Sequence, residues 1–231
     1  MNKPPTGDDA DRPPAVVAVP RRRPRAHTGD QEAEKAVFAA LERLLEATPL
    51  HEISVAQIIT EAQLSRASFY HYFSNKYDVV TALMATIFRD MYSRTHTELE
   101  APWTDPRAAL RHSLSTGMET WFAHRAVIAA VLENQHAVPD LAKVWAVASE
   151  PFRATLTAQI QSERDAGRAP DGLPAETVAA MLIASAERIF YVGSAGVDEK
   201  LRTAAQRLDG IVAVSLAAIY GDPRGPVHDA A

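Results

Sequence analysis

Residues 54–76 constrain the fold of this chain more than any other part of its sequence. Ser54 and Gln57 have the Ser-x-x-Gln spacing of a capping box, which predicts that a short helix begins immediately after Ser54. The apolar periodicity is interrupted at residues 63–64, and Ser65 then stands where the N-cap of another helix is expected. Two short helices joined by so tight a turn are typical of a helix-turn-helix unit.

The second of these helices has an unusual surface for an acidic protein. Phe69 and Phe73 are four residues apart and therefore share one helical face, which we expect to be buried. No acidic residue occurs between Glu61 and Asp78, so the opposite face can approach phosphates without repulsion. The plainer alternative is an ordinary amphipathic helix in a bundle.

A longer helix, predicted over residues 31–47, precedes this pair. Its apolar residues recur at helical spacing and form one stripe, made by Val37, Phe38, Leu41, Leu44 and Leu45. Thr48-Pro49 ends it, because proline disfavours helix at the residue before it. Together the three helices predict a tri-helical DNA-binding unit over residues 30–77.

Residues 53–76 resemble the helix-turn-helix motif of the TetR family of bacterial repressors. The aromatic core of that motif is Phe69-Tyr70-His71-Tyr72-Phe73, and Lys76 matches the lysine that opens the family's fourth helix. One departure is Gln63, where the family usually has glycine. If the turn needs a positive φ, a residue other than glycine costs on the order of 1 kcal/mol.

The resemblance implies a set of DNA contacts. Lys76 is expected on a phosphate, and Arg66 has a guanidinium fork suited to guanine. The residues predicted to contact DNA are Ser54, Val55, Ser65, Arg66, Ala67, Ser68, Tyr70, His71, Tyr72 and Lys76.

The composition fits a folded helical protein whose basic residues are concentrated on one surface. Hydrophobic residues make up 47% of the 231 residues, cysteine is absent, and the net charge is −5. The absence of cysteine excludes a disulfide scaffold, and an acidic body repels DNA except at the intended face. Residues 1–29 are rich in proline, and this composition predicts a disordered arm. Residues 222–231 are predicted to form a disordered tail. The arginine cluster at residues 21–25 is either an arm that reaches DNA or a solvated tail.

The rest of the chain, residues 78–221, predicts a helical bundle. Six further helices are expected, at residues 77–99, 106–123, 125–135, 139–165, 175–194 and 199–220. With the three N-terminal helices they make an all-α protein of about nine helices. No apolar run approaches 18 residues, so a membrane span is not expected.

Large apolar side chains are concentrated in the bundle. They predict either a plain core or an apolar ligand cavity between helices. The resemblance favours the cavity, because TetR-like bodies bind small molecules there, and residues 121–127, 186–190 and 219–221 look similar to EthR-like members. The predicted ligand-binding residues are Leu110, Leu114, Gly117, Met118, Trp121, Phe122, Trp145, Phe152, Ile183, Phe190 and Tyr191. Candidate polar groups are Glu119, Thr120, Asn134 and Ser185.

The last two helices carry many alanines, which allow close approach between helices. The resemblance implies a four-helix dimer interface made by these two helices of each subunit. The alternative is packing within one chain.

The sequence shows no motif that indicates an enzyme. Gly193-Ser194-Ala195-Gly196 is not a Gly-x-Ser-x-Gly elbow, and there is no glycine-rich phosphate loop and no metal-ligand spacing, so no cofactor is expected. We expect a cytoplasmic homodimeric repressor that binds a pseudo-palindromic operator and is released by an apolar small-molecule effector. The alternatives are a small-molecule-binding helical protein whose DNA unit is non-functional, and a helical enzyme.

Overall fold

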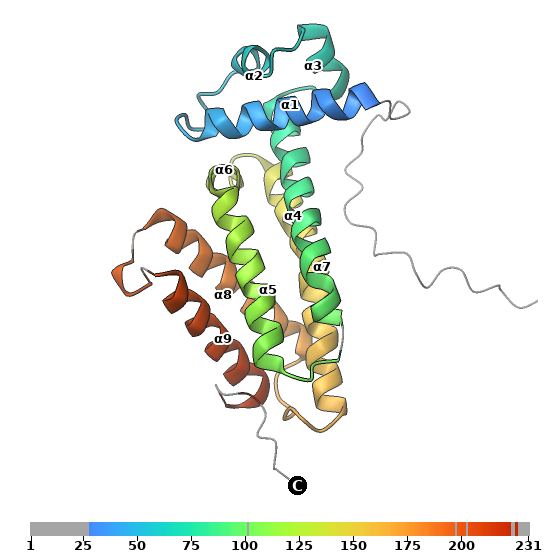
Figure 1. Cartoon of the computed structure of the whole chain (residues 1–231), viewed down its shortest axis with the longest axis vertical. Helices are drawn as coiled ribbons and strands as arrows, with labels where there is room; N and C mark the ends of the chain where they lie inside the picture. The colour runs from blue at the N-terminus through green and yellow to red at the C-terminus, as the bar shows by residue number, and fades with distance from the viewer. Residues whose placement is uncertain (1–27, 101, 197, 202, 223–224, 226–231) are drawn as a thin grey trace, which may run out of the picture.

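The computed structural model describes residues 28–100, 102–196, 198–201, 203–222 and 225. Within them the regular secondary structure consists of nine α-helices and one short 3-10 helix, which confirms the predicted fold class (Figure 1). The helices are α1 Thr28–Leu45, α2 Val55–Glu61, α3 Arg66–Tyr72, α4 Lys76–Glu100, α5 Pro106–Ala123, α6 Arg125–Asn134, α7 Pro139–Asp165, α8 Ala175–Ala195, η1 Glu199–Leu201 and α9 Ala204–Tyr220.

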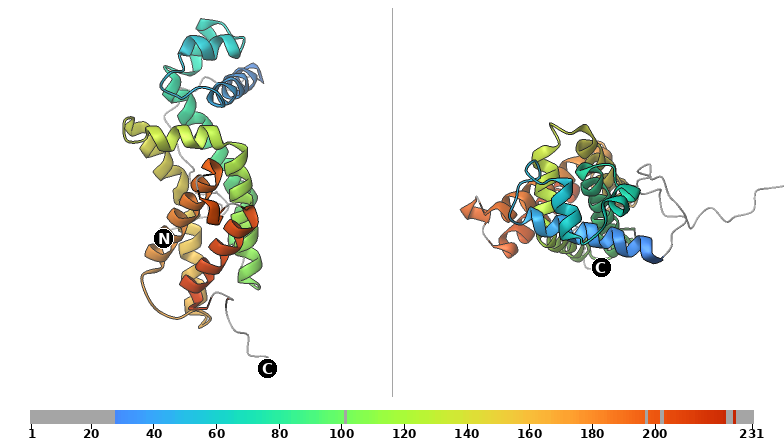
Figure 2. Two further views of the ribbon diagram at one scale, coloured as in Figure 1. Left: turned by 90° about the vertical axis from the view of Figure 1, so that its left-hand side faces the viewer. Right: turned by 90° about the horizontal axis from the view of Figure 1, so that it is seen from above.

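The helices form a small head and a larger body. Helices α1, α2 and α3 lie together at one end of the molecule, and α4 runs from this head down into the body (Figure 1). In the body α4 packs against α7 and α5, α8 packs against α7 and α9, and α9 also packs against α5. Figure 2 shows α8 and α9 side by side on one outer face. The helix α4 is therefore shared by the head and the body.

The head is held together by buried apolar side chains that are continuous with the core of the body. Phe69 is fully buried and Phe73 nearly so, as their shared face predicts. The Phe73 ring lies 6.0 Å from the Phe38 ring of α1 and 5.7 Å from the Phe69 ring, centroid to centroid. Leu41 and Ile58 are buried in the same core. Burial of these rings fixes α3 on α1, because each aromatic side chain removes a large apolar area from water.

The start of the last helix differs from the expectation. A single helix from residue 199 was predicted, whereas the structure has the 3-10 turn η1 and then α9 from Ala204. The reason is a second capping box: the Thr203 hydroxyl accepts from the Gln206 backbone N–H at 3.1 Å, and the Gln206 side chain accepts from the Thr203 N–H at 3.0 Å. This Thr-x-x-Gln signal is present in the sequence and was missed.

The ends of the chain fall largely outside the described residues. Helix α1 already begins at Thr28, so residues 28 and 29 of the predicted arm belong to this helix. The arginine cluster at residues 21–25 lies outside the described residues, as does most of the predicted tail at 222–231. In the part of the chain that the structure describes, no helix has the length and apolarity needed to cross a membrane.

A buried polar network anchors the far end of the body. The Glu163 carboxylate is fully buried at the end of α7, where it accepts from the Tyr220 hydroxyl of α9 at 2.9 Å and from Arg168 Nη2 at 2.7 Å. Burial is the main cause that raises the pKa of Tyr220 well above its ordinary value. A buried charge is tolerated when it is paired and hydrogen-bonded, and here the pairing joins α7 to α9.

Candidate nucleic-acid interface and the aromatic cluster of the body

The turn between α2 and α3 is a Schellman motif. The Gln63 N–H donates to the Thr60 carbonyl at 3.1 Å, and the Leu64 N–H donates to the Ile59 carbonyl at 3.1 Å. Gln63 takes a positive φ of 54° and is the only residue other than glycine to do so in the described segments. The turn therefore needs a positive φ, as considered from the sequence, and Gln63 adopts this left-handed conformation in place of glycine.

Helix α3 exposes one side and buries the other. The Ser65 hydroxyl accepts from the Ser68 N–H at 3.0 Å, which confirms Ser65 as the N-cap. Arg66, Ala67 and His71 are exposed, and the exposed fraction of Tyr70 is 45%. The Arg66 guanidinium lies 5.5 Å from the centre of the Tyr70 ring, so the two side chains cover the outer face of α3 together.

The remaining residues of the predicted interface lie at its border. Ser54 is exposed and caps α2 through the predicted capping box, in which the Gln57 N–H donates to the Ser54 hydroxyl at 3.2 Å. Val55 in the first turn of α2 is half-buried, as is Tyr72 on α3. Residues 62–77, which include α3, contain no acidic side chain.

Lys76 has different partners from the predicted phosphate. Its ammonium donates to three backbone carbonyls of the segment between α1 and α2: Leu50 at 2.7 Å, His51 at 2.9 Å and Ile53 at 2.7 Å. Three donors are all that an ammonium has. Burial lowers the pKa of Lys76 from its ordinary value. Lys76 thus links the start of α4 to the α1–α2 connection, and its contact with a DNA phosphate stays a prediction.

The N-terminus of α4 is closed by its own residues. The Asn75 side-chain oxygen accepts from the N–H groups of Tyr77 and Asp78 at 2.8 and 3.1 Å. The Asp78 carboxylate accepts in turn from the Ser74 N–H at 2.9 Å. The first acidic residue after α3 is consequently held on the α4 terminus by local hydrogen bonds.

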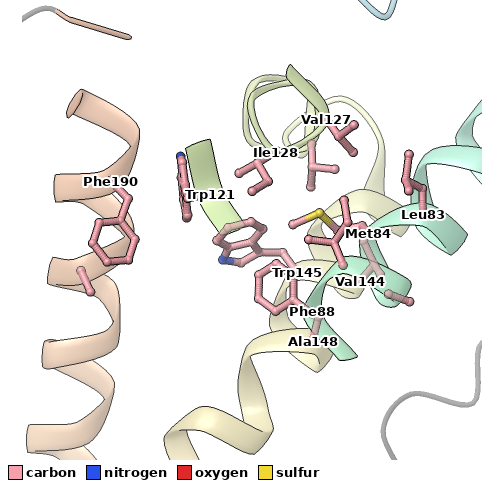
Figure 3. Close-up of a cluster of buried hydrophobic side chains, with 14 of the residues drawn as sticks. Leu83, Met84, Phe88, Trp121, Val127, Ile128, Val144, Trp145, Ala148 and Phe190 are labelled. Carbon is pink, nitrogen blue, oxygen red and sulfur yellow. The ribbon is translucent and has the colours of Figure 1, made fainter. Parts of the chain in front are cut away.

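The body contains a row of aromatic rings in which neighbouring rings pack in edge-to-face geometry. Trp121 of α5 lies between Phe190 of α8 and Trp145 of α7, with ring centroids 5.8 and 5.7 Å away (Figure 3). Phe88 of α4 continues the chain at 5.2 Å from Trp145, and Phe152 of α7 follows at 6.1 Å from Phe88. We call Phe88, Trp121, Trp145, Phe152 and Phe190 the aromatic cluster. It joins four helices of the body.

The structure thus brings four of the predicted ligand-binding residues together and adds one. Phe88 was missed, although Met84, Phe88 and Tyr92 recur every four residues on α4 and all three are buried. Gly117 borders the cluster: a β-carbon there would lie 3.5 Å from Phe190 Cε2 and 3.9 Å from Met91 Sδ. Gly117 therefore faces the space between α4 and α8.

The other predicted ligand-binding residues are dispersed. The Phe122 ring faces α9, where the Arg207 guanidinium lies 5.1 Å from its centre. The Tyr191 hydroxyl lies 3.5 Å from Glu133 at the end of α6. Leu110 and Met118 are buried in the general core, whereas Leu114 and Ile183 pack against it from partly buried positions.

The predicted polar groups do not converge on the aromatic cluster. Glu119 and Ser185 are exposed, so their assignment to an interior site is wrong. The Thr120 hydroxyl and the Asn134 amide donate to carbonyls of their own helices, those of Thr116 and Ala130. Two of these side chains thus form hydrogen bonds within their own helix, and the other two point to solvent.

Glu187 is the polar residue that reaches the cluster. It lies on α8 one turn before Phe190, is partly buried, and accepts from Trp145 Nε1 at 3.3 Å. Burial raises the pKa of this carboxyl above its ordinary value, against the smaller lowering by the Trp145 hydrogen bond and the charge of Arg153. Sequence reasoning missed it, because the alternation of apolar and charged residues around Glu187 is equally typical of a solvated position.

Helices α8 and α9 expose several apolar side chains. The exposed fractions are 60% for Met181 on α8 and 54% for Val214 on α9. Ala180 and Ala184 are exposed beside Met181, and Ala218 lies one turn after Val214. Other alanines of the predicted interface, Ala179 and Ala186, are buried within the chain.

The head and body together define a helix-turn-helix DNA-binding regulator with a helical sensor-like domain. Two family models match the chain: the bacterial regulatory proteins of the TetR family over residues 37–83, and the C-terminal domain of the transcriptional regulator EthR over residues 110–221. The HTH-type transcriptional regulator EthR of Mycobacterium tuberculosis is 32% identical over 210 residues, which cover 90% of this chain and 96% of that protein.

Solved structures share the fold at lower identity. A putative TetR-family regulator from Syntrophomonas wolfei matches with a TM-score of 0.67 and 14% identity, over 81% of this chain and 95% of that one. A complex of SmeT with triclosan matches with a TM-score of 0.63 and 16% identity, over 79% and 90%.

The chain belongs to the TetR family of bacterial transcriptional regulators, and its body is EthR-like. Regulators of this family bind operator DNA and act as dimers, and they are not enzymes.

Proposed function

We propose that this protein is a repressor that reads a pseudo-palindromic operator with α2 and α3 of each subunit. The observation that carries the proposal is the outer face of α3: exposed Arg66, Ala67, Tyr70 and His71 stand on a helix fixed by Phe69, in a stretch with no acidic residue from 62 to 77. Arg66 is the side chain with the fork for guanine, and Tyr70 and Tyr72 are suited to phosphates. Such a regulator acts where the DNA is, in the cytoplasm.

Dimerisation through α8 and α9 supplies the two-fold symmetry that the operator requires. The two helices lie side by side on one outer face of the body (Figure 2) and expose Met181, Ala184, Val214 and Ala218. An isologous interface buries the same apolar patch on both subunits. Small side chains in this patch let the four helices approach closely.

The aromatic cluster supports the proposal of an apolar effector. SmeT, which has the same fold, forms a complex with triclosan, an aromatic small molecule. In this chain Trp121, Trp145 and Phe190 join α5, α7 and α8, and Phe88 extends the cluster to α4. An effector that enters between these rings must displace α4, because close-packed helices shift as units.

A polar link gives this displacement a second route to the head. His124 lies at the junction of α5 and α6, and its Nδ1 is 2.6 Å from Glu42 Oε1 on α1. Both side chains are about one-third exposed. Movement of the α5–α6 junction therefore pulls on α1 directly, while α4 moves the end of α3.

The experiment is affinity selection of random duplex DNA by the purified protein. We expect enrichment of an inverted repeat. Arg66→Ala should relax the preference at one base pair in each half-site and cost roughly 1–3 kcal/mol on the preferred base. If no inverted repeat is enriched, the alternative of a small-molecule-binding protein with a non-functional DNA unit is correct. If Arg66→Ala weakens binding to every sequence equally, Arg66 contacts the backbone instead.

A further inference from the structure

Glu187 is a carboxylate with few partners at the edge of the aromatic cluster. Its one polar contact in the described part of the chain is the Trp145 Nε1 donor at 3.3 Å. Among the described residues no Lys, Arg or His forms an ion pair with it. Arg153 acts on it only through space, since the Arg153 fork is held by Glu150 at 2.6 and 3.0 Å. The carboxyl is therefore partly removed from water and forms no ion pair among the described residues, although the charge of Arg153 acts on it through space.

This arrangement is unfavourable for an anionic group by itself. Burying a carboxylate is costly unless a positive charge or several donors accompany it. The raised pKa of Glu187 follows from that cost. One indole N–H at 3.3 Å is a weak substitute for a counter-ion, so the site favours the arrival of a positive charge.

The neighbouring rings favour the same chemistry. Glu187 and Phe190 are three residues apart on α8, so their side chains lie on the same side of the helix. Phe190 packs on Trp121 and Trp121 packs on Trp145, the residue that donates to Glu187 (Figure 3). Faces of tryptophan and phenylalanine attract cations through their ring quadrupoles, most of all when water is excluded.

We propose that the effector of this protein is an organic cation, an amine carried on an apolar or aromatic frame, whose ammonium group pairs with Glu187. This inference rests on the proposed role of the aromatic cluster as the effector site and specifies the charge of its ligand. The apolar frame inserts among Trp121, Trp145 and Phe190, whose contacting rings separate to admit it, and the ammonium pairs with the carboxylate. A neutral effector would leave Glu187 without a cation.

The test compares two probes of the same shape. 4-Phenylbutylamine is protonated at neutral pH, whereas 4-phenylbutanol is neutral. Binding to the full-length protein is measured by calorimetry and by the change in tryptophan fluorescence. We expect the amine to bind about tenfold more tightly than the alcohol, as for a charge pair in a partly desolvated site. Glu187→Gln keeps an acceptor for Trp145 and removes the charge, so it should remove this preference.

Two controls separate the possible outcomes. Glu176→Gln makes the same charge change in the first, exposed turn of α8 and should leave both affinities unchanged. Thermal unfolding checks that each variant is folded, and operator binding without probe reports DNA recognition separately. If amine and alcohol bind equally, or if Glu187→Gln keeps the preference, the charge assignment is wrong while an apolar effector site stands. If neither probe binds to a protein that still binds its operator, the cluster is not a site for organic cations.

Discussion

Single residues in the head show where this chain departs from common sequence patterns. Gln63 holds a φ of 54°, a conformation that costs an L-residue roughly 1–2 kcal/mol and glycine almost nothing. Both hydrogen bonds of the turn depend on that conformation. The orientation of α3 on α2 is therefore maintained against a local strain that the packing of Phe69 and Ile58 offsets.

Gln63→Gly should make the protein more stable. Relief of the left-handed strain exceeds the extra entropy of glycine in the unfolded chain, so the free energy of unfolding should rise by roughly 0.5–1 kcal/mol. Urea denaturation measures the change. As a control, Gln161→Gly places the same substitution at an exposed position within α7 and should lower stability by about 1 kcal/mol. A loss of stability at both positions would show that the turn carries no strain.

Lys76 gives a second test at this scale. Lys76→Met keeps the aliphatic stem but removes all three donors to Leu50, His51 and Ile53. Carbonyls that lose their partner in a partly buried site should lower the stability of the head by roughly 1–3 kcal/mol, with faster amide exchange in residues 46–54. The salt dependence of DNA binding should stay the same.

A phosphate contact by Lys76 would give a different result in the same experiment. If Lys76 leaves the carbonyls to contact a phosphate on DNA, Lys76→Met should lower the slope of log affinity against log salt by roughly 1. Unchanged stability together with that lower slope would contradict the claim that Lys76 stabilises the head through its hydrogen bonds to the backbone. Lys35→Met, at an exposed position of α1, is the matched control, and stability should change by less than about 0.5 kcal/mol.

At the scale of elements, α4 is the part that links DNA reading to the body. Its first residue braces the head, and its middle carries Phe88 and Met91 into the body core. Gly117 on α5 faces the same region, 3.5 Å from Phe190 and 3.9 Å from Met91 as measured from its β-carbon position. A larger side chain at this position must push α5 away from Phe190 of α8 and Met91 of α4.

Gly117→Trp should mimic the effector. We expect operator affinity to fall by about 100-fold, which corresponds to a coupling of roughly 3 kcal/mol, while the dimer stays folded. Fluorescence anisotropy with labelled operator and size-exclusion chromatography measure the two properties. Glu119→Trp adds the same ring on the exposed side of α5 and should leave affinity unchanged. Normal affinity and normal effector release in Gly117→Trp would show that this region does not control the head.

At the scale of the whole molecule, the sequence predicted the head better than the body. Capping boxes, the turn and the Phe69–Phe73 face are local patterns, and a single chain displays them directly. The order of the helices followed from the same signals, apart from the start of α9. The partners of Lys76 could not be predicted, since they lie 23–26 residues away and depend on how α4 meets the α1–α2 connection.

The aromatic cluster illustrates the limit more clearly. Trp121, Trp145 and Phe190 were assigned to one site, yet Phe122, beside Trp121, faces Arg207 on α9. Adjacent helical residues point about 100° apart, so the packing partners of α5 decide which ring enters the cluster. Glu187 was missed for the same reason: hydrophobic periodicity does not show that a charged residue is covered by a neighbouring helix.

The most direct test of the central claim is a hydroxyl-radical footprint of the dimer on the DNA recovered by selection. Two reading heads related by a two-fold axis should protect two symmetric half-sites on one face of the duplex, about 34–36 Å or a multiple of it apart. Addition of effector should remove both protections together. A single protected patch, or protection without two-fold symmetry, would contradict the account of α2 and α3 as paired reading heads.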